Sequence, residues 1–166
     1  MFRYCTGCRS RRSRSSHSYK ERKGIKTSKD ILLSLHPKWF NPIMTGEKIF
    51  EVRKHAPAQT DPFLVYLYCT NGQEAWWASV PSAYRMNGKV CGEFGCLGIE
   101  KRHAPWKGQE EGTGLTARQL YEYAAGRDEL YFLLIAEPCM YNPPLELSDF
   151  GMTRPPQSWC YLKRKE

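Results

Sequence analysis

Three charged side chains of different chemistry lie close together in segment 46–53, whose sequence is GEKIFEVR. The ammonium of Lys48 and the guanidinium of Arg53 can each bind a phosphate or the carbonyl oxygen of a base. The carboxylate of Glu51 can accept a hydrogen bond from an exocyclic amine, such as that of cytosine or guanine. Together the three groups have the chemistry needed to hold a nucleotide.

The pattern around these residues predicts how they are placed. Residues 48–54 alternate with period two, which is typical of a β-strand, so Glu51 and Arg53 share one face of that strand. Lys48 follows shortly after Gly46, where the chain enters the strand. Solvated strands often carry such charges, so an internal Glu51–Arg53 ion pair that only fixes the strand is the structural alternative.

Segment 46–53 fits the pattern G-x-K-x-x-E-x-R and, with the preceding strand and Pro37-Lys38, resembles the signature of the ASCH domain family of PUA-like β-barrels. Residues 88–94 (GKVCGEF) resemble the next barrel strand of that family. Residues 155–161 (PPQSWCY) resemble the closing strand of its bacterial and phage-type members. The resemblance runs roughly from Lys29 to the C-terminus. It implies an α+β fold, a small PUA-like mixed β-barrel with two or three flanking helices.

The resemblance favours an RNA- or nucleotide-binding module, with RNA or a nucleotide as the partner and no cofactor. Its ligand cleft would be floored by segment 46–53, and aromatic neighbours could stack on the base. A protein-interaction module, in which the charged motif is purely structural, is an alternative. The predicted binding residues are Lys48, Glu51 and Arg53, followed in second rank by Lys38, Gln157, Ser158 and Tyr161.

A hydrolase acting on a modified nucleoside or on RNA is the enzymatic alternative. One branch of the family resembles amidohydrolases that remove an acyl group from N4 of cytidine, using the motif lysine, a threonine three residues later and a glutamate from elsewhere. Lys48 matches the lysine, but Glu51 stands in place of the threonine and lacks the hydroxyl that this acyl transfer needs. Glu93 is the candidate for the glutamate. Another member resembles a ribonuclease, which implies Lys48 and Ser158 as the pair, so the catalytic candidates are Lys48, Glu51 and Ser158.

Positive charge is concentrated at the start of the chain. The protein has 25 Lys and Arg against 17 Asp and Glu, a net charge of +8. Residues 1–29 hold ten basic residues and one acid, or +9, so residues 30–166 hold 15 and 16, or −1. We expect a disordered Arg/Ser-rich arm over 1–29 and one ASCH/PUA-like domain over 30–166. The arm either contacts nucleic-acid phosphates or is a dispensable leader.

Composition also bears on location and on metals. No segment approaches the roughly 18 consecutive apolar residues of a membrane span, and the N-terminus lacks the apolar stretch of a secretory signal. We therefore expect a cytoplasmic protein with no membrane contact. Seven cysteines, odd in number and scattered, predict reduced thiols. Cys5 and Cys8 form a C-x-x-C motif, but a suitable second pair of ligands is missing nearby, so we predict no metal.

The remaining elements follow from apolar runs and from capping and turn residues. A capping box at Thr116 and Gln119 predicts a helix to about Ala125, with Leu120, Tyr121 and Ala124 on one face. Trp76 and Trp77 either pack or offer a stacking face to bases, and at most one would line a site because neighbours on a strand point to opposite faces. The other predicted elements are strands at 31–35, 63–69, 130–137 and 158–162, a bent glycine-containing strand at 89–102, a kinked or broken helix at 38–45, and an irregular segment at 138–151.

Overall fold

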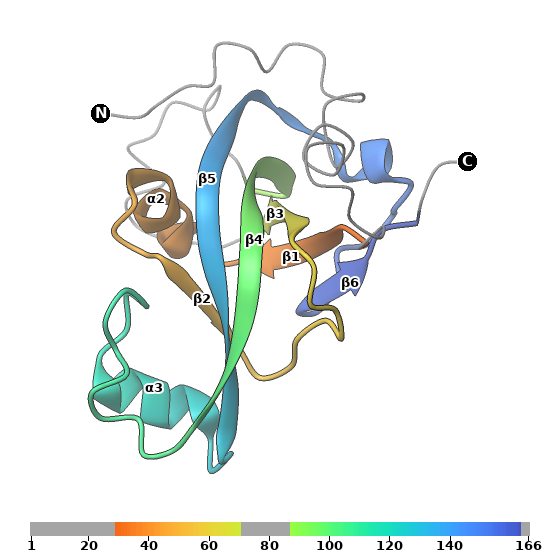
Figure 1. The fold of residues 1–166 in the computed structure, drawn as a ribbon. Coiled ribbons are helices and arrows are strands. Elements are labelled where there is room, and N and C mark those ends of the chain that lie inside the picture. Colours follow the sequence, from red (N-terminus) through yellow and green to blue (C-terminus); the bar gives the residue numbers. More distant parts are fainter. Residues whose placement is uncertain (1–28, 71–86, 164–166) are drawn as a thin grey trace.

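A six-stranded mixed sheet forms the body of the protein (Figure 1). The structure is a computed structural model that describes residues 29–70 and 87–163. In the order β2-β5-β4-β3-β1-β6, the strands are β1 (Ile31–Leu35), β2 (Phe50–Arg53), β3 (Phe63–Cys69), β4 (Lys89–His103), β5 (Glu129–Leu145) and β6 (Trp159–Tyr161). β1 and β3 are parallel, and the other neighbours are antiparallel.

Two α-helices flank the sheet, α2 (Pro37–Thr45) and α3 (Ala117–Ala124), and a 3-10 helix covers Leu147–Phe150. β4 and β5 run side by side through the middle of Figure 1, and α3 lies beside their lower end. This arrangement confirms the predicted α+β class, with a curled sheet and two α-helices. Among the described residues, no helix is both long enough and apolar enough to cross a membrane.

Side chains join the two edges of the curled sheet. The indole Nε1 of Trp159, on β6, donates to the carbonyl oxygen of His55 just after β2 (3.0 Å). Arg53, the last residue of β2, donates through Nη2 to Ser34 O on β1 (2.8 Å) and through Nη1 to Ser158 Oγ (3.2 Å). The sheet therefore forms a half-barrel whose edge strands are linked through side chains.

The main core fills the concave side of the half-barrel. Ile31 and Leu33 of β1 meet Val65 and Leu67 of β3, and Phe94 of β4 completes the layer with no exposed surface. Leu32, between them, points the other way, into a second cluster on the opposite face of the sheet. Because both faces of β1 are covered, its uninterrupted apolar sequence is what a buried strand requires.

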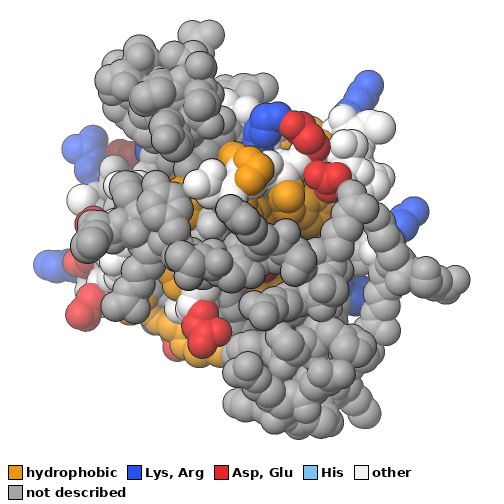
Figure 2. Space-filling model, turned by 90° about the horizontal axis from the view of Figure 1, so that it is seen from above, with side chains coloured by type: hydrophobic (Ala, Val, Ile, Leu, Met, Phe, Trp, Pro, Cys, Tyr) orange, Lys and Arg blue, Asp and Glu red, His pale blue; other side chains and the backbone are white. Residues whose placement is uncertain are grey.

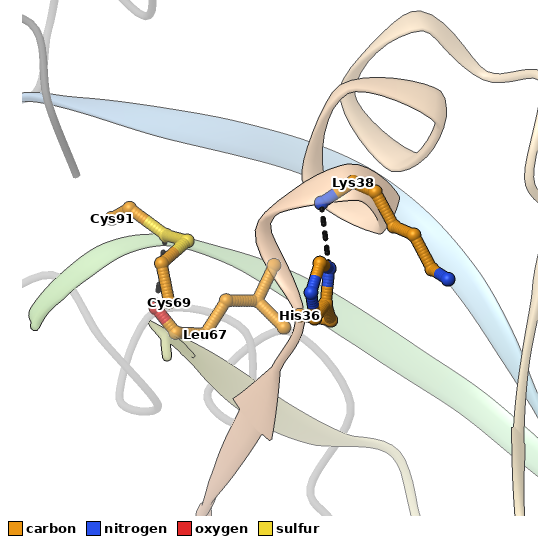
Figure 3. Close-up of a disulfide and its surroundings, with 5 residues drawn as sticks. All are labelled: His36, Lys38, Leu67, Cys69 and Cys91. Atoms are coloured by element: carbon orange, nitrogen blue, oxygen red, sulfur yellow. Dashed lines mark hydrogen bonds between the residues drawn. A yellow bond between two sulfur atoms is a disulfide. The ribbon is translucent and has the colours of Figure 1, made fainter. Parts of the chain in front are cut away.

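Helix α2 follows β1 after a single residue. His36 caps its start, with Nδ1 accepting from Lys38 N at 3.3 Å, as Figure 3 shows. Gly46 ends the helix with φ of 83°, a conformation that glycine adopts without strain. We expected the helix to kink or break at Pro42, but it continues through that residue. Burial of Phe40 and Ile43 against the core offsets the one backbone bond that proline cannot make.

Helix α3 begins with the predicted capping box. Thr116 Oγ1 accepts from Gln119 N, and the Gln119 side chain accepts from Thr116 N. Leu120 and Ala124 are buried as expected, but Tyr121 is 71% exposed. The predicted apolar face was wrong at this position, because it is Tyr123 that packs beside Leu120 and Ala124. Tyr123 thereby places an aromatic ring near β2.

Removal of the cap should weaken α3 by a measurable amount. Thr116→Ala leaves the backbone N–H of Gln119 without its side-chain acceptor, so we expect a loss of about 1 kcal/mol in unfolding free energy. Urea unfolding measures it. Thr45→Ala, in the last turn of α2, is the matched control and should change stability less. Equal effects from the two variants would contradict the capping role.

Strand β5 extends further than predicted. We expected a strand at 130–137 followed by irregular chain, but β5 runs on to Leu145. Val90 pairs with Leu145 and Gly92 with Met140, so four residues of β5, including Pro143 and Pro144, lie opposite one residue of β4. Prolines are tolerated at such a bulge because it requires no ladder hydrogen bond from them.

Glycine in β4 permits a close approach of backbones, as the sequence suggested. A Cβ atom added at Gly92 would lie 2.5 Å from the carbonyl oxygen of Cys139 on β5. The same atom would lie 3.1 Å from the Phe40 ring of α2. Gly92 therefore lets α2 and β5 pack against β4 at the same point.

Cys69 of β3 and Cys91 of β4 form a disulfide between neighbouring strands (Figure 3). Our expectation of reduced thiols is wrong for this pair. The two residues are 22 positions apart, and only the pairing of β3 with β4 brings them together. Among the described residues, Cys96, Cys139 and Cys160 are not part of a disulfide.

Several predictions lie outside the described residues. They concern residues 1–28 of the arm, including Cys5 and Cys8, and the pair Trp76 and Trp77. On the face drawn in Figure 2, acidic and basic side chains are interspersed over the described surface.

Candidate functional site

The motif lies where α2 turns into β2. Lys48 N donates to Pro42 O within α2 at 2.9 Å. The next two backbone amides, Ile49 N and Phe50 N, both donate to Gly112 O, at 2.7 and 2.9 Å. The turn is therefore fixed on one side by α2 and on the other by the loop before α3.

Lys48, Glu51 and Arg53 converge in one buried cluster. Arg53 Nε lies 2.8 Å from Glu51 Oε1, and Lys48 Nζ lies 3.4 Å from Glu51 Oε2. The side chains of Lys48, Glu51 and Arg53 are only 3%, 6% and 12% exposed. Glu51 and Arg53 share a strand face, as the alternation predicted. Two cations and one carboxylate leave the cluster with one excess positive charge.

Lys48 is enclosed by backbone and aromatic groups. Its Nζ donates to Thr113 O at 2.5 Å and lies 5.1 Å from the centre of the Trp39 ring. Gly114 packs against that ring, and a Cβ atom added there would lie 3.2 Å from it. Burial lowers the pKa of Lys48 from its ordinary value of 10.5, and the charge of nearby Glu51 counteracts this only in part.

This lowered pKa gives a prediction for stability against pH. Between the lowered value and 10.5, the unfolded chain still holds a proton that the folded protein has released. Stability must then rise with pH through this window. We expect the unfolding free energy of the wild type, measured in urea relative to Lys48→Met, to increase as pH rises from neutral toward 10.5. A difference that stays flat or falls would contradict the burial of the charged amine.

The second carboxylate oxygen of Glu51 is incompletely satisfied. Within the described part of the chain, Glu51 Oε2 is buried and accepts no hydrogen bond of acceptable geometry. Lys48 Nζ lies 3.4 Å from it. A buried carboxylate oxygen without a hydrogen bond is costly, so it is a candidate acceptor for a ligand N–H group.

Arg53 connects the motif to the closing segment of the sheet. Besides Glu51, its guanidinium reaches Ser158 Oγ and Ser34 O. Ser34 Oγ in turn donates to Pro156 O at 2.6 Å. Of the second-rank candidates, Ser158 is thus brought into contact with the motif.

The other second-rank candidates are not in contact with the three charges. Lys38 is exposed and lies 5.1 Å from the centre of the Trp39 ring, the same ring that Lys48 approaches. Gln157 is exposed beside Ser158. The Tyr161 hydroxyl accepts from Ala58 N at 3.1 Å, so this side chain belongs to a different contact.

Sequence reasoning missed three residues that shape the cluster. Thr113 supplies the acceptor for Lys48, and Ser34 supplies one for Arg53, in both cases through backbone oxygen atoms that no side-chain pattern reveals. Tyr123 of α3 lies close enough that Arg53 and Glu51 both affect the pKa of its hydroxyl, which burial raises. Tyr123 lies three residues after Leu120, and this helical spacing was the signal in the sequence that could have placed the two on one face.

The predicted glutamate of a hydrolase lies elsewhere. Glu93 hydrogen-bonds to Tyr141 and pairs across the sheet with Tyr66. Both tyrosines belong to the cluster on the face of the sheet opposite α2 and the main core. Burial, with Glu93 nearby, raises the pKa of Tyr141. Glu93 is therefore not placed to act together with Lys48.

A hollow of about 560 Å³ lies against α3, between that helix and the chain that follows β4. Its lining includes Pro105, Trp106, Tyr121 and Arg127 but none of the predicted site residues. Within residues 29–70 and 87–163, no three His, Cys, Asp or Glu side chains are grouped so that they could hold a metal ion.

The curled mixed sheet with its two helices defines a PUA-like α+β module. A family model described as the ASCH domain matches residues 33–141, well over half of the chain. The chain belongs to the ASCH domain family. The motif lies within the matched residues, whereas Ser158 and the closing strand β6 lie beyond them.

Crystal structures of an ASCH protein from Zymomonas mobilis have a similar fold. One has 20% sequence identity and a TM-score of 0.64, covering 82% of this chain and 89% of that one. A serine-to-alanine mutant of the same protein has 19% identity and a TM-score of 0.65, and the match covers 84% of this chain and 92% of that one. A tyrosine-to-phenylalanine mutant has 19% sequence identity and a TM-score of 0.64, and the match covers 82% of this chain and 92% of that one. None of the curated proteins matches the chain.

Proposed function

We propose that this ASCH domain binds RNA or a nucleotide at the cluster of Lys48, Glu51 and Arg53. The proposal depends on one observation. Within the described part of the chain the buried Glu51 Oε2 accepts no hydrogen bond of acceptable geometry, although Lys48 Nζ lies 3.4 Å away. A purely structural ion pair would be more stable with both carboxylate oxygens satisfied. An exocyclic amine of a base would supply the donor that Oε2 lacks.

The charge of the cluster suits the rest of a nucleotide. Lys48 and Arg53 together outweigh Glu51 by one positive charge, which favours an anion in a poorly hydrated setting. Ser158 contacts Arg53, whose side chain is 12% exposed, and Gln157, the residue before Ser158, is exposed. A ligand would approach Arg53 from this side, and at Lys48 the ring of Trp39 offers an aromatic surface that the exposed Lys38 also approaches.

A ligand panel tests the proposal directly. Thermal unfolding is followed with nucleosides, nucleoside monophosphates and short RNAs, because a ligand that binds the native state raises the melting temperature. We expect monophosphates whose base carries an exocyclic amine, those of cytidine, adenosine and guanosine, to stabilise more than uridine monophosphate. No stabilisation by any member of the panel would refute the proposal.

A hydrolase is the second candidate, and one observation favours it. The lowered pKa of Lys48 increases the fraction of neutral amine, which can act as a general base. In this arrangement Glu51 would hold the lysine, and Ser158 would be the nearby hydroxyl bound by Arg53. Incubation with N4-acetylcytidine and with single-stranded RNA, followed by chromatography, tests it. Turnover that persists in Lys48→Met would contradict a role for this base.

A further inference from the structure

Arg53 begins a row of side chains that crosses three strands. Tyr131 on β5 is its direct partner in the sheet, and Lys101 on β4 is the partner of Tyr131. Directly paired residues of antiparallel strands project from the same face. Lys101 Nζ lies 5.7 Å from the centre of the Tyr131 ring, so the lysine and the ring are neighbours. The row places one aromatic ring between two cations.

The row lies on the same face as the motif and becomes more exposed away from it. Glu51 and Arg53 share that face, and Tyr131 packs partly against the main core within the half-barrel. Side-chain exposure rises from 12% at Arg53 to 50% at Lys101, with Tyr131 half-buried between them. A ligand seated at the motif could therefore continue outward along the row.

We propose that Tyr131 and Lys101 form a second subsite, in which a single-stranded nucleic acid extends from the motif across β5 to β4. Tyr131 stacks on the base next to the one at the motif, and Lys101 binds the phosphate that follows. This inference rests on the proposed function, and it makes the ligand a strand rather than a free nucleotide. Alternating aromatic and basic groups suit such a ligand, because every base has a stacking face and every linkage has a charge.

Acidic neighbours do not block this subsite. Glu129 lies 3.7 Å from Lys101 Nζ and 3.9 Å from His103 Nδ1, but its side chain is 44% exposed. Ion pairs between such exposed groups contribute little to stability, so a phosphate can take the place of the carboxylate. Arg102, next in the chain, faces the opposite side and lies over the rings of Phe50 and Phe132.

The test compares ligands of increasing length. Oligocytidylates and oligodeoxycytidylates of one to six nucleotides are titrated by fluorescence anisotropy or calorimetry. We expect affinity to rise by roughly 5- to 150-fold once a second base can stack. Tyr131→Phe should keep this gain, and Tyr131→Leu should lose it while leaving the affinity for the mononucleotide unchanged. Melting curves establish that each variant is folded.

Salt dependence isolates the lysine. Lys101→Gln should reduce the slope of log affinity against log salt by about 0.7, the value for one phosphate of a single strand. Lys89→Gln is the matched control, because Lys89 lies at the other end of β4 and also pairs with a glutamate, Glu146. Its slope should match the wild type.

The outcomes separate the two proposals. If mononucleotides bind but longer strands gain nothing from Tyr131, the subsite is wrong and the proposed function stands. If no nucleotide or strand binds, the proposed function fails and the subsite fails with it. Equal slopes for Lys101→Gln and the wild type would also overturn the subsite.

Discussion

Replacement of Glu51 by alanine is expected to lower the unfolding free energy by about 3–5 kcal/mol. Among the described residues, Glu51 is the carboxylate that pairs with both Lys48, which is buried, and Arg53, whose side chain is 12% exposed. Its loss leaves two positive charges close together without compensation, and removing one partner of a buried ion pair is far more costly than the pair itself is stabilising. Urea unfolding near neutral pH measures the effect.

Glu129→Ala is the matched control for this substitution. Glu129 also faces a lysine, Lys101, at 3.7 Å, but both side chains are about half exposed. We expect it to change stability by no more than about 1 kcal/mol, as for other surface pairs. A loss for Glu51→Ala as small as that of the control would mean that water reaches the cluster freely and that the charges are not buried together.

The motif was the part of the site that the sequence revealed best. Period-two alternation placed Glu51 and Arg53 on one face, and Gly46 marked where α2 ends before β2. The partners of these residues were not predictable in the same way. Gly112 O holds the turn through two amides, and Thr113 O accepts from Lys48, but a backbone oxygen belongs to every residue type. Only the folded path of the loop shows which oxygens are used.

The fold was predicted well where local chemistry decides it and poorly where long-range pairing does. The capping box of α3 and the buried run of β1 are local signals, and both were confirmed. The continuation of β5 past Pro138 depends on β4, which pairs with it across a bulge. The Cys69–Cys91 disulfide depends on the pairing of β3 with β4 in the same way. Neither can be read from a single segment.

Burial of the motif is compatible with two uses of the same charges. Arg53 links β2 to Ser34 and Ser158, so it contributes to closing the half-barrel whatever else it does. Lys48 does not link strands in this way, because its contacts are with Glu51, Thr113 and Trp39. Lys48 is therefore the residue at which a structural role and a binding role can be separated.

Lys48→Met is expected to weaken nucleotide binding about 10- to 150-fold while changing the unfolding free energy by no more than about 1–2 kcal/mol. A hydrogen bond to a charged group contributes about 1.5–3 kcal/mol, which sets the loss of affinity. Stability changes less because Glu51 keeps Arg53 as its partner, at 2.8 Å. The methionine side chain can also pack against Trp39 in place of the lysine stem, without the cost of burying a charge. Calorimetric titration with the monophosphate that stabilises best, together with urea unfolding, measures both quantities.

Lys89→Met controls for the loss of one positive charge. Lys89 is 37% exposed and pairs with Glu146 near the start of β4, so its replacement should leave nucleotide affinity unchanged. If Lys48→Met folds and binds nucleotide as tightly as this control, the buried cluster serves only to hold α2 and β2 together. The exposed surface of the domain would then be the place to look for a partner, as expected for a protein-interaction module. If affinity falls and stability does not, the lysine is retained at a buried position for its ligand, because the fold itself does not require it.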